Sequence, residues 1–530
     1  MKLPRKAVSI SALAIALALI TSSTAVAAIT PVLVSGPSPV AACASSDAAQ
    51  PGRVFPNAEV EPQIAVHGDK VITMFHQDRW SNGGGHAIGV SVSKDGGATW
   101  TESAMPWDSC ASGTPSGTPS SLSGYMRASD PWVSFGPDGI AYASALAFNI
   151  LVPNWANAVA VASSTNGGAT WDNVGPIPGS EFTQAAQGTD KNSTTADPTR
   201  NKTAYTVWDT LILPTDHPDD NPHTASYTGP AYFSKTTDGG QTWSQAKIII
   251  DTKTRQQTIG NIIVVAPDGT LYDFTDLIIS PNTPFQGTRS NAQLAFVKST
   301  DGGDTWTQPQ VIAPFNSLGV HNPNNTRESL RVGDGLEEVA IDPASGKLYV
   351  VYQSSTNYQK QLKQSSGAWD DEILLVTSGD KGATWTAPLV VHHLASGLPT
   401  FTPTIAVNGG RVAVTYYDTR NLGATQTDHL PTNYWVKYSI DGGATFPDSS
   451  EQPIGATFDS RTAPIARGFF LGDYEGLQPS GSGFLAVYVK TNCDAPYPAS
   501  NPYCAPADSS TSSPHTTNTN PTDVFVATLS

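Results

Sequence analysis

Short apolar runs recur along the whole chain and are separated by clusters of Gly, Pro, Asn and Asp. The clearest set is PQIAV (62–66), KVITMFHQDR (70–79) and AIGVSVS (87–93), followed by a turn and a last short run. Runs rich in Val, Ile, Tyr and Phe between turn residues are typical of β-strands. The pattern therefore predicts a unit of four short antiparallel strands.

The second strand of this unit recurs six more times, as GIAYASALAF, KTAYTVWD, GTLYDFTD, GKLYVVYQ, GRVAVTYYD and GFLAVYVK. Four-stranded units repeated about a centre form the blades of a β-propeller. The prediction is an all-β protein with a seven-bladed β-propeller fold. Six blades is the alternative if the first or last unit is not a full blade. The later units begin near Asp130, Asp190, Asn261, Leu336, Pro403 and Gly472.

One turn sequence joins the third and fourth strands of the first six units. Its copies are SKDGGATW (93–100), STNGGATW (164–171), TTDGGQTW (236–243), STDGGDTW (299–306), SGDKGATW (378–385) and SIDGGATF (439–446). In the first copy, Asp95 is expected to accept hydrogen bonds from backbone N–H groups across the turn, and Gly96 and Gly97 to take positive φ. The Trp100 ring is expected to pack between neighbouring strands. One acid per loop is too few oxygen ligands for calcium. Six copies therefore indicate scaffold rather than an active site.

The last unit ends with DVFVATLS and no such turn follows it. The segment TPVLVSG (30–36) is predicted to supply its outer strand, which would close the ring and leave no long sheet edge free.

Composition agrees with a turn-rich exported protein. The 530 residues include 46 Gly and 41 Pro, and only 14% are charged. Residues 1–28 read as a signal peptide, with a basic start, an apolar run and a small-residue cleavage pattern. We therefore expect a secreted protein with one domain at 29–530. Within it, 505–521 is a Ser/Thr-rich loop before the closing strand.

The formal net charge of −16 becomes −19 when the three cations of the signal peptide are removed. Such an acidic protein repels nucleic acid and anionic membranes, so neither is an expected partner. Of the four cysteines, Cys493 and Cys504 flank a short segment and are expected to pair, which leaves Cys43 for Cys110. Three pairings are formally open.

The pattern S-x-D-x-G-x-T-W resembles the Asp-box, or BNR, motif of the sialidase superfamily. Longer strings such as QDRWSNGG, SDPW, TIGN and FLGDYEGL are similar to a bacterial group of secreted exo-α-sialidase-like BNR proteins. The resemblance covers most of the mature chain. It implies a propeller and suggests glycan chemistry, although the Asp-box itself is not the sialidase active site.

In each unit, antiparallel pairing puts the start of the first strand and the end of the second on the same face. Polar groups gather at these positions, so we expect the substrate to bind there. The expected substrate-binding residues are Arg79, Arg331, Arg420, Asp78, Asp190, Lys191, Asp209, Asn261, Asp418 and Asp473. Glu61 also stands at such a strand start.

Sialidases hold the sugar carboxylate with three arginines and use a Tyr–Glu pair as nucleophile and an Asp as acid/base. The resemblance implies Arg79, Arg331 and Arg420 as the clamp. It implies Tyr474 with Glu475 as the nucleophile pair. The acid/base is then Asp130.

The early Arg-Ile-Pro signature of sialidases is missing, so these roles are hypotheses. A polysaccharide lyase, another exo-glycosidase or a non-catalytic glycan- or protein-binding propeller are the alternatives. The chemistry requires no cofactor, and calcium at the mouth is possible. We expect a glycan partner and a monomer.

Overall fold

The computed structural model describes residues 28–43, 50–111, 121–150, 156–183, 186–213, 227–279, 292–358, 371–394, 397–498, 500–504 and 520–530. Within these ranges the chain is built of β-strands with a few one-turn 3-10 helices, so the all-β prediction is confirmed. The predicted signal peptide, apart from its last residue, and residues 505–519 of the predicted Ser/Thr-rich loop lie outside the described residues.

Most described strands belong to antiparallel groups of four, each paired in the order first, second, third, fourth. We number these groups along the chain. Group 1 is β2 (Val60–His67), β3 (Lys70–Arg79), β4 (Gly85–Ser93) and β5 (Thr101–Ala104); group 2 is β6 (Arg127–Phe135), β7 (Ala141–Phe148), β8 (Asn157–Ser164) and β9 (Asp172–Pro176); group 3 is β10 (Gln187–Ala196), β11 (Ala204–Ile212), β13 (Ala231–Thr236) and β14 (Lys247–Ile250). Group 4 is β15 (Gln256–Val265), β16 (Leu271–Ile279), β17 (Ala292–Ser299) and β18 (Gln310–Pro314); group 5 is β21 (Glu337–Ile341), β22 (Leu348–Ser354), β23 (Glu372–Ser378) and β24 (Leu389–His392). Group 6 is β25 (Thr400–Asn408), β26 (Arg411–Asp418), β27 (Pro431–Ser439) and β28 (Gln452–Asp459); group 7 is β30 (Gly476–Ser480), β31 (Gly483–Thr491), β32 (Thr522–Leu529) and β1 (Val32–Leu33).

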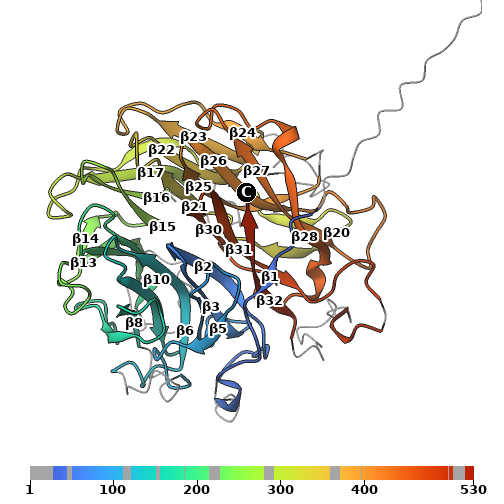
Figure 1. Cartoon of the computed structure of the whole chain (residues 1–530), viewed down its shortest axis with the longest axis horizontal. Helices are drawn as coiled ribbons and strands as arrows, with labels where there is room; N and C mark the ends of the chain where they lie inside the picture. Colours follow the sequence, from blue (N-terminus) through green and yellow to red (C-terminus); the bar gives the residue numbers. More distant parts are fainter. Residues whose placement is uncertain are drawn as a thin grey trace, which may run out of the picture.

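The first strands of the groups contact one another in a circle. β2 contacts β6, β6 contacts β10, and the series continues through β15, β21, β25 and β30 back to β2. In Figure 1 most of these first strands lie near the middle of the view, and the later strands of each group lie further out. Two short connections merge neighbouring groups into longer sheets: one Gly85–Ala128 pair joins groups 1 and 2, and β12 (Thr228–Gly229) joins groups 3 and 4.

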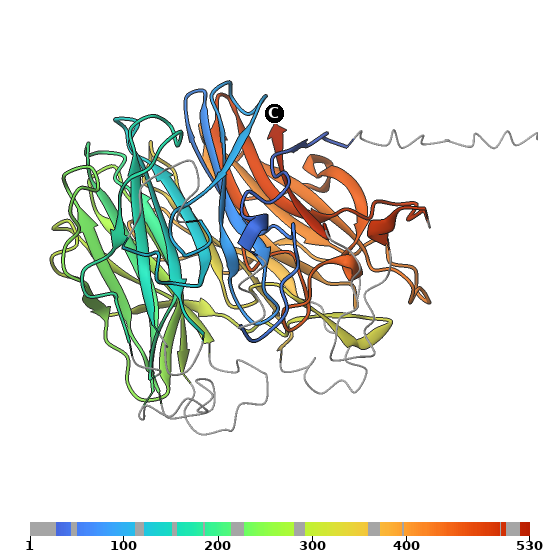
Figure 2. The same cartoon turned by 90° about the horizontal axis from the view of Figure 1, so that it is seen from below.

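A small three-stranded sheet lies between groups in the sequence. It consists of β19 (Val320–Asn322), β20 (Asn325–Arg331) and β29 (Phe469–Phe470), and it pairs Arg331 with Phe470. In Figure 2 the yellow β19–β20 hairpin lies at the lower end of the strands. This sheet brings the segment before group 5 beside the segment before group 7, which positions residues of the candidate site.

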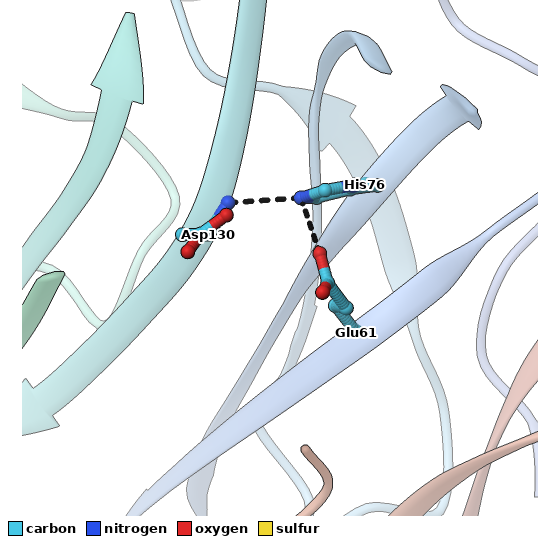
Figure 3. A group of neighbouring side chains, drawn as sticks. All are labelled: Glu61, His76 and Asp130. Atoms are coloured by element: carbon cyan, nitrogen blue, oxygen red, sulfur yellow. Dashed lines mark hydrogen bonds and ion pairs between the residues drawn. The ribbon is translucent and has the colours of Figure 1, made fainter. Parts of the chain in front are cut away.

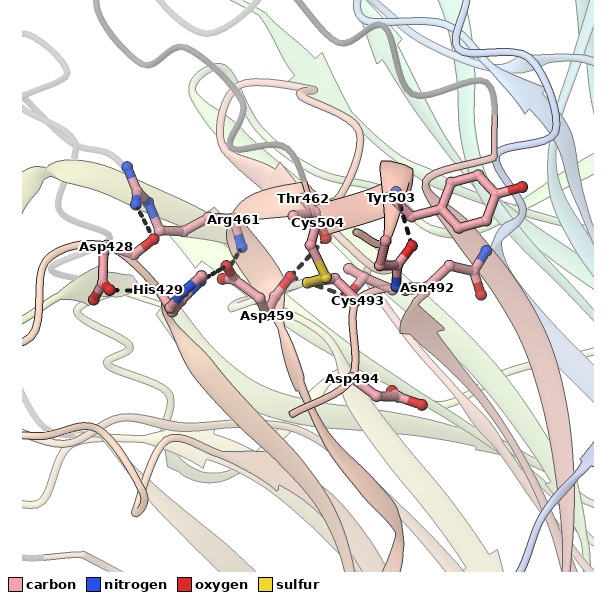
Figure 4. Close-up of a disulfide and its surroundings, with 12 residues drawn as sticks. Asp428, His429, Asp459, Arg461, Thr462, Asn492, Cys493, Asp494, Tyr503 and Cys504 are labelled. Atoms are coloured by element: carbon pink, nitrogen blue, oxygen red, sulfur yellow. Dashed lines mark hydrogen bonds and ion pairs between the residues drawn. A yellow bond between two sulfur atoms is a disulfide. The ribbon is translucent and has the colours of Figure 1, made fainter. Parts of the chain in front are cut away.

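The two ends of the described chain meet in group 7. Val32 pairs with Val526 and Leu33 with Phe525, so the N-terminal segment forms the outer strand beside β32 as the sequence predicts. The expected disulfides, Cys43–Cys110 and Cys493–Cys504, are both confirmed. The second one ties the connection after β31 close to Asp459 at the end of β28 (Figure 4).

The repeated turns connect the third and fourth strands of groups 1 to 6. In the first copy, Asp95 accepts hydrogen bonds from the Thr99 backbone N–H at 2.9 Å and from the Thr99 hydroxyl at 2.6 Å. These bonds, the hydroxyl first, lower the pKa of Asp95 to about 2. The aromatic ring of each turn packs against the preceding group, as Trp385 of group 5 does on Phe274 of group 4. The turns therefore act as scaffold, at the opposite end of the strands from Asp130.

Candidate active site

The first strands of five groups share a β-bulge close to their start. Their pairing registers shift at this point, and one residue in each takes a left-handed backbone. These residues are Glu61 (φ 55°), Asp130 (φ 55°), Lys191 (φ 32°), Gly260 (φ 82°) and Thr402 (φ 48°). A bulge redirects a side chain, and a positive φ at a residue other than glycine stores strain of a kind found at functional sites. Three of these residues, Glu61, Asp130 and Lys191, meet in one cluster.

The first part of this central cluster joins β2, β3 and β6 (Figure 3). His76 Nε2 lies 2.8 Å from Glu61 Oε2 and accepts the backbone N–H of Asp130 at 2.8 Å. Burial lowers the pKa of His76 well below its usual value, with the charge of Arg79 adding to the effect. The imidazole is therefore neutral, and it links the bulge at Glu61 to the bulge at Asp130.

The second part contains two arginines that both contact one phenylalanine ring. The Arg331 guanidinium donates to Asp473 through both Nε and Nη2, and its carbon lies 4.4 Å from the Phe470 ring centre. Arg79 lies 4.8 Å from the same ring and donates to the Gly84 carbonyl at 2.9 Å. Within the described residues, Arg79 Nε has no hydrogen-bond partner. One buried N–H donor is therefore left for a ligand.

The three carboxyl groups of the cluster differ in pKa: those of Glu61 and Asp130 are raised and that of Asp473 is lowered. Burial, followed by the charge of Asp473, raises the pKa of Glu61 to about 7, although Arg79 and Arg331 oppose it. Burial would also raise the pKa of Asp473, but the charge and hydrogen bonds of Arg331 lower it below the usual value. Burial and the charge of Glu61 raise the pKa of Asp130. One carboxylate is thus held ionised beside others that keep a proton more readily, which is the arrangement of acid/base sites.

The third part is a lysine between two aromatic rings. Lys191 Nζ lies 4.3 Å from the Trp132 ring centre and 3.9 Å from that of Tyr474. Lys191 is only 3% exposed, and its ammonium has no hydrogen-bond partner in the described part of the chain. The Tyr474 hydroxyl donates to the Pro131 carbonyl at 3.3 Å, and burial raises its pKa well above the usual value.

Two neighbouring acids of group 3 have different roles. Asp190 has an exposed surface. Desolvation by the surrounding protein, followed by the charge of Asp130, nevertheless raises its pKa to about 6. Asp209 is buried and accepts hydrogen bonds from Thr258 and from the Gly260 backbone N–H, at 2.7 and 2.9 Å. It also accepts the Asn261 side chain. Asp209 and Asn261 therefore brace the bulge of β15, while Asp190 can be reached from solvent.

The structure brings together seven of the residues predicted from the sequence. They are Arg79, Asp130, Asp190, Lys191, Arg331, Asp473 and Tyr474, linked by the contacts described above or by mutual electrostatic effects on their pKa values. Asp209 and Asn261 lie in the supporting layer.

Four other predicted residues point elsewhere. Asp78 accepts hydrogen bonds from Ser38 and Asn57 and lies 3.1 Å from His86, away from the cluster. Glu475 accepts the Tyr417 hydroxyl at 2.5 Å, so it is not joined to Tyr474.

Arg420 and Asp418 lie at the side of group 6. Arg420 is paired with Glu451 and Asp418, and its guanidinium stacks at 3.6 Å on Trp435. Within the described residues, its side-chain hydrogen bonds and ion pairs join it to Asp418, Glu451 and His392, in groups 5 and 6 and the turn before β28. Arg420 therefore does not join the cluster, in which Arg79 and Arg331 lie with Lys191 instead.

Sequence reasoning missed His76 and Phe470 and left Glu61 without a role. His76 and Arg79 both face the cluster although they are three residues apart on β3. The left-handed backbone of Asp78, with φ of 56°, shifts the alternation between them. The position of Glu61 at the start of a first strand could have indicated its role. No feature of the sequence indicated His76 or Phe470.

Glu61, His76 and Asp130 have possible metal-ligand atoms within 4.8 Å of one another. The set does not suit a metal ion. His76 Nε2 already accepts a backbone N–H, and the positive charges of Arg79, Arg331 and Lys191 act on the same carboxyls. These contacts favour proton transfer over metal binding at this cluster.

No protein-family model and no curated protein match this chain. Among solved structures, the Hadza microbial sialidase Hz136 is 15% identical with a TM-score of 0.39, covering 82% of this chain and 64% of that one. The Penicillium chrysogenum α-L-arabinanase is 12% identical with a TM-score of 0.40, covering 73% and 93%. The phage phi92 endosialidase is 12% identical with a TM-score of 0.43, covering 90% and 69%. Similarities this weak support no conclusion on substrate or mechanism.

Proposed function

We propose that this protein is a secreted glycan-active enzyme, a glycoside hydrolase that releases a terminal acidic sugar. One observation carries the proposal: two buried cations with unused N–H donors, Arg79 and Lys191, share a cluster with carboxyls of opposite pKa shift. A buried donor without a partner costs free energy, so a ligand with acceptor oxygens would be bound there. The carboxylate of an acidic sugar supplies such oxygens.

In this proposal Arg331 and Arg79 hold the sugar carboxylate and Lys191 adds a third positive charge. Arg331 remains fixed by Asp473, which orients its fork. Tyr474 Oη bonds to the anomeric carbon while the glycosidic C–O bond breaks. Asp130 gives its proton to the leaving oxygen, which departs as an alcohol. A water molecule then attacks the anomeric carbon and gives a proton to Asp130, while the bond between the sugar and Tyr474 Oη breaks and the group that took the tyrosine proton returns it.

The proton of the Tyr474 hydroxyl needs an acceptor, because burial raises its pKa well above 10. Glu475 is occupied by Tyr417. Among the neighbouring charges, that of Glu61 has the largest effect on Tyr474. A base is most effective when its pKa is near the working pH. We therefore assign this role to Glu61, whose pKa is about 7.

The test is hydrolysis of aryl α-sialosides and aryl β-glucuronides by pure protein, with Tyr474→Phe as the variant. We expect turnover by the wild type and at least a hundredfold loss in Tyr474→Phe, since the phenylalanine lacks the nucleophilic oxygen. Tyr272→Phe is the matched control, because Tyr272 lies in group 4 and its hydroxyl donates to the Lys381 carbonyl at 3.3 Å, beside a repeated turn. Absence of turnover on both substrates, beside an active reference enzyme, would remove the hydrolase proposal.

A polysaccharide lyase is the second candidate. The same three cations would neutralise a uronate carboxylate, and the neutral His76 is held beside them. A lyase forms an unsaturated uronate that absorbs in the ultraviolet, so one absorbance assay on uronate polysaccharides separates the two reactions. A non-catalytic propeller would bind glycans on an array without forming either product.

We also propose that each four-strand group is one blade of a seven-bladed β-propeller forming a single domain at 29–530. The circle of contacts among first strands and the β1–β32 pairing support this arrangement. Two disulfides fit an exported protein. In the part of the chain that the structure describes, no helix is long and apolar enough to span a membrane.

A further inference from the structure

A second polar pocket lies at the side of the molecule, between groups 5 and 6. It has a volume of about 480 Å³ and is lined by Val390, Val391, His392, His393, Arg420, Lys437, Phe446, Asp448 and Glu451. The lining comes from β24 on one side and from β27, with the turn before β28, on the other. This volume is within the range of small-molecule sites and suits one or two sugar rings.

The pocket borders the one repeated turn that lacks tryptophan. The other five turns carry Trp100, Trp171, Trp243, Trp306 and Trp385 at this position, and the sixth carries Phe446. Phe446 packs on the hydrophobic core of group 5 as those indoles pack on their preceding groups. A phenyl ring is smaller than an indole, so part of the volume filled elsewhere is left open here.

Arg420 is held rigidly in the wall of this pocket. Its Nη1 and Nη2 donate to the two carboxylate oxygens of Glu451 at 2.6 and 2.9 Å, and its Nε donates to Asp418 at 2.7 Å. Burial alone would raise the pKa of Glu451, but the hydrogen bonds of Arg420 and Tyr416 lower it. The donors and acceptors are therefore preorganised before any ligand arrives, which reduces the entropic cost of binding.

The charges of the pocket favour an uncharged ligand. In the lining, Arg420 is paired with Glu451 and Lys437 with Asp448, to which it donates at 2.7 Å. An anion would meet Glu451, and a cation would meet Arg420 and Lys437. Phe446 and Val390, which is 44% exposed, offer apolar surface beside these polar groups. Sugars combine hydroxyls that donate and accept with an apolar C–H face.

We propose that this lateral pocket is a second carbohydrate-binding site, specific for a neutral sugar unit. It is separate from the central cluster and does not depend on the reaction assigned there. Such a site would hold the uncharged part of a glycan against the side of the protein, whether or not the central cluster is catalytic.

Binding of lactose, cellobiose and methyl glucoside, measured by isothermal titration calorimetry, tests this site. We expect at least one of them to bind the wild type and to bind Phe446→Trp at least tenfold more weakly, because the larger indole takes up part of the pocket where the sugar would lie. Phe446→Trp introduces the residue that the other five turns carry. A cooperative thermal unfolding transition would show that this variant folds. Ile440→Ala is the matched control: Ile440 lies in the same turn, is 87% exposed and does not line the pocket.

Three results would overturn the proposal. The first is that none of the three neutral sugars binds the wild type. The second is that Phe446→Trp binds them as well as Ile440→Ala does. The third is that only glucuronate or sulfate binds in a way that Phe446→Trp abolishes, which would make the pocket an anion site.

Discussion

Replacing Glu61 by glutamine should change how the stability of the protein depends on pH. Glu61 is 2% exposed, and burial with the charge of Asp473 raises its pKa from 4.5 to about 7. Between these two values the folded protein keeps a proton that the unfolded chain has lost. The free energy of unfolding contributed by Glu61 therefore falls as pH rises from 4.5 to 7 and is constant above that range.

The size of this effect follows from the shift. A difference of about 2.5 pKa units corresponds to about 3 kcal/mol, at 1.36 kcal/mol for each unit. Glutamine has nearly the same shape and does not titrate. The free energy of unfolding of Glu61→Gln minus that of the wild type should therefore increase by about 3 kcal/mol when the pH is raised from 4 to 8. This change is expected whatever the difference between the two proteins at pH 4.

Urea unfolding of both proteins at several pH values between 4 and 8 measures this difference directly. Glu181→Gln is the matched control, because it makes the same chemical change at an exposed position outside the cluster. A Glu61→Gln profile parallel to that of the wild type would refute the inference that Glu61 is held protonated near neutral pH. A relative loss of stability toward pH 8 would show that the sign is wrong.

Three further substitutions test other parts of the molecule. Arg331→Lys should raise KM for an acidic sugar substrate about tenfold, because the bidentate fork on Asp473 and the stacking on Phe470 are lost; an unchanged KM would contradict the clamp. Asp95→Ala should lower the melting temperature, measured by calorimetry, without altering KM, since it removes the acceptor of the first repeated turn; an effect on KM alone would contradict the scaffold role. Replacing Cys493 and Cys504 together by serine should cost about 3 kcal/mol in urea unfolding, from the entropy of the loop they close; unchanged stability would contradict this reasoning.

The sequence by itself determined the features that depend on local chemistry. Alternating apolar runs between turn residues predicted the strands, and the second strands fall where KTAYTVWD and its relatives stand. The repeated turn could be interpreted because its hydrogen bonds join residues four apart, such as Asp95 and Thr99. The cysteine pairing and the outer position of the N-terminal strand followed from spacing and from the missing last turn.

Only the tertiary structure decided which polar side chains share a site. Glu61 and Asp130 are turned toward His76 by left-handed bulges at residues that are not glycine, and no local pattern announces such a backbone. Arg331 meets Asp473 across 142 residues of chain, whereas Arg420, equally polar and also near a strand end, turns to the side onto Trp435. Strand-end position is a local property, but the direction of a side chain depends on bulges and on packing between groups far apart in the sequence.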